Sequence, residues 1–376
     1  MLAAMSLFLI AFALVTPGDS KVKMGDEEFA KPTFDGSRYG NPVSFAGWTG
    51  LPSFSSIWKW KFTEEDNSSL PSQKVVEESL PIQKPDFNIG KSSLAATWLG
   101  HATVLVQLDA VAFITDPVWS QRASPFSFAG PLRYRPPPAE IKDLPKLNFG
   151  VISHNHYDHL DAKAVVELSK RFPDMEWFVP MGLKSWMESS VQGNKVYEMN
   201  WQVEMVVMFS DQIFRGQKIT RTYNGKTCDI WCIPAQHWSQ RGLFDKFKTL
   251  WAGWAVIGST RRFYYTGDTG FCDKEFEKLG DLLGPFDLSA IPIGCYAPRW
   301  FMKPQHINGE EAVQIHIKTR SKNSIAIHWG TYEMGSNEAF DEPPKKLQEA
   351  VEHANLTTKF LSVKHGQTWI IDEVEK

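Results

Sequence analysis

The segment Ser153-His-Asn-His-Tyr-Asp-His-Leu-Asp161 places three histidines and two aspartates within nine positions, directly after the apolar run 149–152. If that run is a buried strand, His154 and His156 leave its end on one face, because side chains alternate along a strand with a period of two. The pair can then hold one metal ion. The alternative is a polar loop that happens to be rich in histidine, but the tight spacing of the donors favours metal binding.

Asp158 and His159 follow in the same segment, where the chain turns toward the helical pattern 161–168. Their oxygen and nitrogen donors can hold a second ion a short distance from the first. The mixture of imidazole and carboxylate suits zinc, whereas sites for calcium or magnesium are dominated by oxygen ligands. The segment therefore predicts a zinc centre with room for two ions.

Composition limits the class of protein. With 376 residues and 43% hydrophobic residues, the chain can bury a large core in one sizeable domain with extensions, or in two smaller domains. The net charge of -3 gives no drive toward nucleic acid, so we expect no nucleic-acid partner. Aromatic residues make up 13% of the chain, which favours an apolar substrate. The four cysteines form no CxxC pair, and we expect reduced, buried thiols without a disulfide.

The N-terminus differs in composition from the rest of the chain. Residues 1–20 form an apolar segment that resembles a signal sequence or a short anchor, although no Lys or Arg precedes it and a bilayer span needs about 20 apolar residues. A cleaved signal, a short anchor and an artefact of the gene model all stay open. If the chain enters the secretory pathway, Asn67 and Asn355 lie in glycan-acceptor tripeptides.

Two further regions follow. Residues 21–90 are rich in Pro, Gly, Ser and charge, and are predicted to form an extension that packs on a larger core in 91–376. From residue 94 onward, β-type runs over 95–99, 103–108 and 111–115 predict an antiparallel meander. Later, helical patterns alternate with β-runs, which indicates sheets covered by helices.

Three later β-runs each end in a metal-binding residue type. These residues are His237, Asp268 and His328. A single histidine at a strand end is more often a hydrogen-bonded structural residue, and an aspartate between glycines is often a turn former. Beside the first cluster, however, the three repeat the same arrangement, in which a rigid sheet fixes the geometry of site-bearing loops.

Together, these residues resemble the ligand set of the metallo-β-lactamase superfamily. The resemblance implies an α+β fold, namely an αββα sandwich with an N-terminal extension. It also implies that one zinc is bound by His154, His156 and His237, the other by Asp158, His159 and His328, and that Asp268 bridges both. Such metals would bring the pKa of a bridging water toward neutrality and polarise the scissile group.

Further motifs narrow the resemblance. Similarity to the N-acylphosphatidylethanolamine-hydrolysing phospholipase D family covers most of residues 38–370 and is carried by Trp98-Leu-Gly-His-Ala-Thr-Val, Thr115-Asp-Pro, Arg122-Ala-Ser-Pro, Gly267-Asp-Thr-Gly, Ala290-Ile-Pro-Ile-Gly, Pro298-Arg-Trp-Phe-Met-Lys and Ile327-His-Trp-Gly. The resemblance implies hydrolysis of a membrane phosphodiester to an N-acylethanolamine and phosphatidic acid, a homodimer and a hydrophobic substrate channel. The apolar N-terminus departs from the family pattern.

Residues outside the ligand set have roles of their own. His306 precedes a helical pattern and resembles a substrate-contacting histidine of the family, so we expect it to orient the phosphate or transfer a proton, with Gln305 as a neighbouring donor. Helix capping is the alternative role for His306. The expected catalytic residues are Asp158, His306 and Asp268, and the expected substrate-binding residues are Gln305 and His306.

Other polar residues have less specific signals. Asp116 and Asp161 are candidates for fixing ligand imidazoles, with turn or helix capping as the equal alternative. His101 is left out of the catalytic set, because a structural role is at least as favoured for it as a position lining the site. His316, His353 and His365 are expected at the surface.

The segment 238–251 mixes Leu243, Phe244, Phe247, Leu250 and Trp251 with basic residues directly after His237. This pattern suits a loop that docks at the headgroup region of a membrane, with ordinary core packing as the alternative. We therefore expect membrane association, either peripheral or through a short N-terminal anchor.

The sequence as a whole favours a dizinc phosphodiesterase that acts on N-acylated glycerophospholipids. The alternatives are a dizinc hydrolase of the same fold that acts on a soluble phosphodiester or a lactone, and a catalytically silent lipid-binding protein that keeps its metals for stability.

Overall fold

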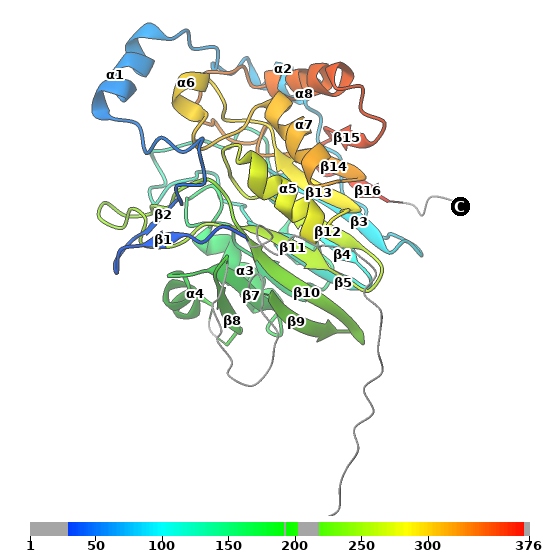
Figure 1. Ribbon diagram of the computed structural model, residues 1–376. Coiled ribbons are helices and arrows are strands. Elements are labelled where there is room, and N and C mark those ends of the chain that lie inside the picture. The colour runs from blue at the N-terminus through cyan, green and yellow to red at the C-terminus, as the bar shows by residue number, and fades with distance from the viewer. Residues whose placement is uncertain (1–28, 192, 202–217, 372–376) are drawn as a thin grey trace, which may run out of the picture.

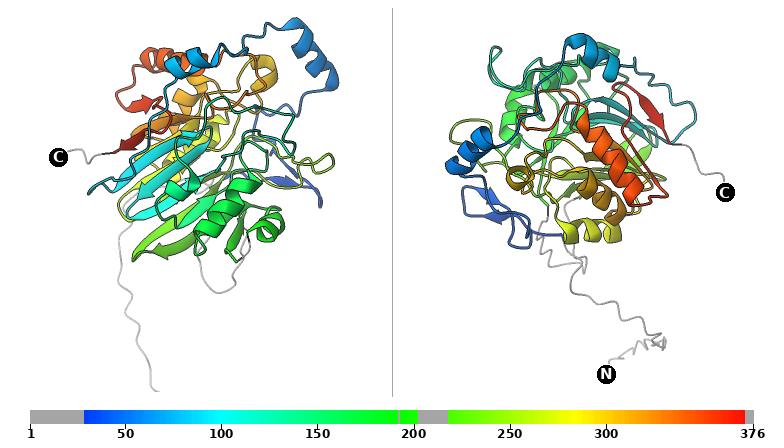
Figure 2. Two further views of the ribbon diagram at one scale, coloured as in Figure 1. Left: turned by 180° about the vertical axis from the view of Figure 1, so that it is seen from behind. Right: turned by 90° about the horizontal axis from the view of Figure 1, so that it is seen from above.

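The computed structural model describes residues 29–191, 193–201 and 218–371. The expected signal or anchor in 1–20 lies outside the described residues. Two seven-stranded sheets face each other, and helices cover their outer surfaces (Figures 1 and 2). The αββα sandwich predicted from the sequence is therefore confirmed.

The first sheet contains the meander expected from residue 94 onward. Its strand order is β16-β3-β4-β5-β6-β7-β8, with antiparallel pairing from β16 to β5 and parallel pairing from β5 to β8. The strands are β3 (Leu94–Gly100), β4 (Thr103–Leu108), β5 (Val111–Thr115), β6 (Phe149–Val151), β7 (Glu176–Pro180), β8 (Val196–Met199) and β16 (Thr368–Ile370).

The second sheet repeats this plan with the order β15-β14-β13-β12-β11-β10-β9. Pairing is antiparallel from β9 to β12 and parallel from β12 to β15. The strands are β9 (Lys218–Tyr223), β10 (Lys226–Ile233), β11 (Gly253–Ile257), β12 (Arg262–Tyr265), β13 (Leu288–Pro292), β14 (Asn323–Ile327) and β15 (Lys359–Leu361).

The core lies between the two sheets. Phe113 of β5 meets Phe263 of β12 with ring centroids 5.5 Å apart, and both side chains are fully buried. A second apolar cluster joins the outer face of the first sheet to α3 (Ala162–Arg171) and α4 (Lys184–Ser190). The second sheet is covered by α5 (Asp273–Leu282), α7 (Gly309–Lys318) and α8 (Glu342–His353). All four cysteines are buried free thiols.

The N-terminal extension lies along one end of the sandwich (Figure 1). It contains the hairpin β1 (Thr33–Phe34) and β2 (Tyr39–Gly40) and the helices α1 (Phe54–Thr63) and α2 (Gln73–Ser79). Trp60 of α1 is buried against Phe301 of α6 (Arg299–Met302), and its indole N–H donates to Asn337. A single 3₁₀ turn (Ile141–Asp143) precedes β6. Within the described ranges, no helix is long and apolar enough to span a bilayer.

Candidate metal centre

Strand ends bring the predicted ligands to one end of the sandwich. The C-terminal ends of parallel strands meet at one edge of a sheet, and β6, β10, β12 and β14 lead there into the loops that carry the candidate ligands. The structure brings together all seven side chains singled out from the sequence, namely His154, His156, Asp158, His159, His237, Asp268 and His328. Their roles as ligands stay predictions.

The first group is formed by three imidazoles. His154 Nε2 lies 2.8 Å from His156 Nδ1, and His237 Nε2 lies 3.4 Å from the same atom. The other nitrogens of His154 and His237 are held from outside: His154 Nδ1 lies 2.8 Å from Ser153 Oγ, and His237 Nδ1 lies 3.0 Å from the carbonyl oxygen of Gln305. The inward-facing nitrogens are thus oriented by contacts behind them.

The second group contains Asp158, His159 and His328. His159 Nε2 lies 3.1 Å from His328 Nε2, and Asp158 Oδ2 lies 3.5 and 3.6 Å from these two nitrogens. Asp268 stands between the two groups, because its Oδ2 is 3.2 Å from His159 Nε2, 3.1 Å from His328 Nε2 and 3.8 Å from His237 Nε2. Its position matches the bridging role expected from the sequence.

The donor atoms fit a metal ion better than they fit one another. Imidazole nitrogens around a tetrahedral zinc, at Zn–N of about 2.0–2.1 Å, are separated by about 3.3 Å. The separations of 3.1 Å between His159 and His328 and 3.4 Å between His156 and His237 are close to this value. Asp268 Oδ1 is also buried without a hydrogen-bond partner. Convergent, partly unpartnered donors of this kind suit a cation.

The electrostatics of the centre also favour positive charge. Burial raises the pKa of Asp268, but His159 and His328 outweigh it and hold that pKa well below its usual value. Burial conversely disfavours charge on His328, yet Asp268 beside it raises the pKa of His328 to about 9. The carboxylates therefore create a potential that stabilises cations, whether protons or metal ions.

Asp116 supports this centre from behind. Its Oδ2 lies 2.6 Å from His159 Nδ1 and accepts a hydrogen bond from Tyr265 at 2.5 Å, while its Oδ1 accepts from the Ser153 backbone N–H at 2.7 Å. Asp161 does not share the role considered for both residues. Its carboxylate caps α3 and accepts from the backbone of Trp119, so the capping alternative holds for Asp161.

His306 enters the centre from the loop before α7. Its Nδ1 lies 3.8 Å from Asp268 Oδ2, and its ring centroid lies 5.3 Å from that of His237. Burial lowers the pKa of His306 to about 4, so the imidazole is neutral near pH 7. Gln305 is buried beside it, and its side-chain oxygen accepts from the indole N–H of Trp238 at 2.6 Å.

His101 is a functional candidate that sequence reasoning set aside. Its Nε2 lies 3.0 Å from Asp158 Oδ2, and the side chain is fully buried. The expected surface positions of His316 and His365 are also wrong, because both are buried. His316 hydrogen bonds with Ser324 and Thr358, and His365 with the carbonyl of Leu99. His353 is exposed, as expected.

The segment 238–251 divides into exposed and buried residues. Leu243 and Phe244 are 86% and 82% exposed, whereas Leu250 and Trp251 are buried and Phe247 is half-buried beside Trp48. The core-packing alternative therefore holds for Leu250, Trp251 and Phe247, and docking stays a prediction for Leu243 and Phe244. The segment carrying the exposed pair projects past the sheets near the β1–β2 hairpin (Figures 1 and 2).

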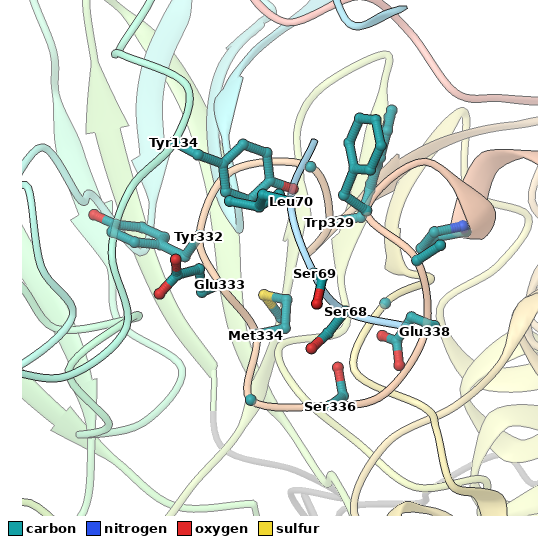
Figure 3. A pocket seen from close by; sticks show the side chains of 16 residues that line it. Ser68, Ser69, Leu70, Tyr134, Trp329, Tyr332, Glu333, Met334, Ser336 and Glu338 are labelled. Atoms are coloured by element: carbon teal, nitrogen blue, oxygen red, sulfur yellow. The ribbon is translucent and has the colours of Figure 1, made fainter. Parts of the chain in front are cut away.

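Two cavities lie near the centre. One, of about 360 Å³, is lined by Phe126, Tyr157 and Arg241, and Tyr157 directly precedes Asp158. The other, of about 280 Å³, lies between the extension at Ser68–Leu70 and the loop after His328 (Figure 3). Its wall includes Trp329, which directly follows His328, and neither cavity is lined by any of the seven predicted ligands.

Comparison with known families and solved structures identifies the superfamily to which the fold belongs. Residues 112–329 match a family model described as a beta-lactamase superfamily domain. Among solved structures, a metallo hydrolase from Ignicoccus hospitalis superimposes with a TM-score of 0.52 at 19% identity, over 75% of this chain and 99% of that chain. At this identity the likeness shows the fold alone, which is that of the metallo-β-lactamase superfamily.

Curated relatives then give the particular family. A Caenorhabditis elegans protein named N-acyl-phosphatidylethanolamine-hydrolyzing phospholipase D 1 is 51% identical over 94% of this chain and 98% of its own length. A mitochondrial protein of that name from Saccharomyces cerevisiae is 30% identical over 86% of this chain and 66% of its own length. The chain therefore belongs to the N-acyl-phosphatidylethanolamine-hydrolyzing phospholipase D family, which confirms the resemblance seen in its motifs.

Proposed function

We propose that this chain is a dizinc phosphodiesterase that hydrolyses N-acylphosphatidylethanolamine to N-acylethanolamine and phosphatidic acid. The observation that carries the proposal is the 51% identity, over nearly the full length of both chains, to a protein named for this activity. The two groups of imidazoles joined by Asp268 support it, because hydrolysis of a phosphodiester needs a site that stabilises negative charge.

We propose that the metal is zinc, with two ions in each chain. His154, His156 and His237 would hold one ion, Asp158, His159 and His328 the other, and Asp268 would contact both. Bound zinc would supply a water nucleophile near neutral pH and would polarise the phosphoryl group. The mixed imidazole and carboxylate donors support zinc over calcium or magnesium.

The protein's own residues then orient the substrate. His306 is neutral near pH 7, so one ring nitrogen can donate a hydrogen bond to a phosphate oxygen while the other can accept one. We propose that the unprotonated nitrogen accepts a proton from the attacking water and that the ring returns a proton to the leaving ethanolamine oxygen. Gln305 holds His237 through its carbonyl and Trp238 through its side-chain oxygen. Its side-chain amide nitrogen donates to Met302 Sδ at 3.8 Å, and we propose that the second N–H of this amide serves the substrate.

We further propose that the protein works at a membrane surface as a peripheral enzyme. A lipid with two or three acyl chains leaves a bilayer at a cost of about 0.8 kcal/mol per exposed methylene, so the centre has to meet the lipid where it lies. Leu243, Phe244, Phe126 and Phe128 support this proposal, because all four are more than half exposed. We call these four side chains the rim. Arg241 stands two positions before Leu243 in the sequence and lines the same cavity as Phe126.

Assembly as a homodimer and entry into the secretory pathway are also proposals. The dimer rests on the resemblance to the family. Secretory entry rests on the apolar composition of residues 1–20 and is compatible with the exposure of Asn67 and Asn355. Sugar on either asparagine, found by mass spectrometry of protein from its native cells, would support that route.

The activity is tested by identifying products from three substrates. Protein of known metal content is incubated with N-acylphosphatidylethanolamine in vesicles, with a lactone and with a soluble phosphodiester. We expect release of N-acylethanolamine and phosphatidic acid at a rate that increases with the zinc content of the protein. Faster turnover of the lactone or the soluble diester would favour another hydrolase of this fold, and turnover of none would favour a silent lipid-binding protein.

A further inference from the structure

His101 stands out because it contacts two different parts of the second ligand group. It follows β3 in the tight turn to β4, and its side chain has no exposed surface. Its ring nitrogen Nε2 lies 3.0 Å from Asp158 Oδ2, while its carbonyl oxygen accepts a hydrogen bond from the backbone N–H of His328 at 2.9 Å. One residue thus touches the side chain of one predicted ligand and the backbone of another.

The backbone of His101 is fixed on both sides. Its N–H donates to Thr331 Oγ1 at 2.7 Å, and its carbonyl also accepts from the indole N–H of Trp98 at 2.8 Å. The residue has a φ of 49°, in the left-handed region that is unfavourable for most side chains. These contacts offset that cost and hold the ring in one place.

Among the described residues, Asp158 is the one side chain that makes a polar contact with the His101 ring. His101 Nδ1 is buried without a hydrogen-bond partner, so Asp158 is the sole acceptor that the described residues provide for the imidazole N–H. The ring centroid lies 4.2 Å from that of His328 and 5.5 Å from that of Tyr332, which packs the imidazole between ligand and scaffold. The tautomer with the proton on Nε2 is therefore the one that this environment favours.

We propose that His101 is a positioning residue that orients the carboxylate of Asp158 for the metal ion of the second group. Donation from Nε2 occupies one lone pair of Oδ2 and stops the carboxylate from rotating, so that its remaining lone pairs face His159 and His328. This role rests on the proposed metal centre but not on the proposed substrate. His101 itself contacts no substrate in this account.

Two substitutions separate the hydrogen bond from the backbone strain. His101→Gln keeps an N–H donor close to the position of Nε2. His101→Asn is suited to the left-handed backbone, but its shorter amide reaches only the position of Nδ1 and leaves Asp158 without its donor. The matched control is the same pair of changes at His316, another buried histidine whose partners are Ser324 and Thr358.

The test measures metal affinity without substrate. Zinc is titrated against a chromophoric chelator, and cobalt is used to follow ligand geometry by its visible absorption. We expect His101→Asn to weaken one of the two sites by about 10- to 100-fold, the usual effect of losing an outer partner of a ligand, and to alter the cobalt spectrum. We expect His101→Gln to stay within a few-fold of wild type, and both His316 variants to lower the melting temperature with metal affinity unchanged.

Two results would overturn the proposal. If His101→Asn binds both metals as the wild type does, Asp158 needs no help from this ring. If Gln and Asn weaken binding equally, the imidazole acts in some other way, for example as a ligand. Because the readout is metal affinity, failure of the chain to cleave N-acylphosphatidylethanolamine would leave this proposal standing, and its own failure would leave the substrate proposal standing.

Discussion

The metal centre and the rim lie at the same end of the sandwich, but their side chains are held in opposite ways. His154 and His159 are at most 1% exposed, and both ring nitrogens of each have a partner. Leu243 and Phe244 are more than 80% exposed. A buried, oriented side chain is suited to catalysis, and an exposed apolar side chain is suited to transient contact with a membrane surface. Because of this difference, we expect substitutions in the metal centre to change catalysis and substitutions in the rim to change access to the substrate.

The largest expected effect comes from removing the charge that joins the two ligand groups. Asp268→Asn keeps the size of the side chain but removes the carboxylate that lies within 3.8 Å of four imidazoles, three of them predicted ligands. We expect loss of bound metal and a fall in turnover of about 100-fold or more, since a direct ligand should matter at least as much as its outer partners. Elemental analysis and kinetics on one preparation measure both, and Asp273→Asn, at a 55% exposed carboxylate, is the control. Two bound zincs with near-wild-type turnover would rule out the bridge.

A slightly smaller effect is expected at His306, which belongs to the centre but is not a predicted ligand. His306→Ala removes a positioned acid or base, a change that costs typically about 10²–10⁴-fold in rate. Turnover should fall on vesicle and soluble substrates alike, while vesicle binding and metal content stay at wild-type levels. His353→Ala, at an exposed histidine, should change neither property. Full activity of His306→Ala would show that the assigned role is wrong.

The rim should show the opposite pattern. Leu243→Ser combined with Phe244→Ser removes two apolar side chains, each worth about 1.5–3 kcal/mol when fully buried, so partial insertion predicts a loss of vesicle affinity on the order of 10- to 100-fold. Flotation with vesicles measures it, and turnover of a soluble short-chain phosphodiester should be spared. Ile317→Ser with Leu361→Ser changes two exposed apolar residues outside the rim and serves as the control. Equal losses of turnover on vesicle and soluble substrates would show that Leu243 and Phe244 act in the packing of the protein and not in membrane binding.

The smallest effect concerns stability away from both regions. Burial lowers the pKa of His316 to about 4, below the usual value of about 6.5 for an unfolded histidine. The unfolded state therefore binds more protons below pH 6.5, and the stabilising contribution is complete above that pH and is lost as the pH falls toward 4. Urea unfolding measures the free energy of unfolding of wild type and of His316→Gln. We expect the difference between the two free energies to narrow by up to roughly 3 kcal/mol as the pH falls over this range. A difference independent of pH would contradict the burial argument.

The sequence predicted the centre better than its surroundings because the centre is encoded locally. Spacing within 153–161 and the ends of β-runs sufficed to single out the seven side chains that the structure brings together, since strand periodicity and strand ends decide where such side chains point. His101 was missed because its importance depends on Asp158, a partner far away in the sequence. His316 was misplaced for the same reason, because the hydroxyls of Ser324 and Thr358 that make its burial favourable come from other elements.

The central claim is that water attacks phosphorus in a membrane lipid at this metal centre. The most direct measurement is hydrolysis of N-acylphosphatidylethanolamine vesicles in ¹⁸O-labelled water by protein of known zinc content, followed by mass spectrometry of both products. We expect one labelled oxygen in the phosphate of phosphatidic acid and none in the N-acylethanolamine. Label in the N-acylethanolamine, or no product from zinc-loaded protein, would contradict the central claim.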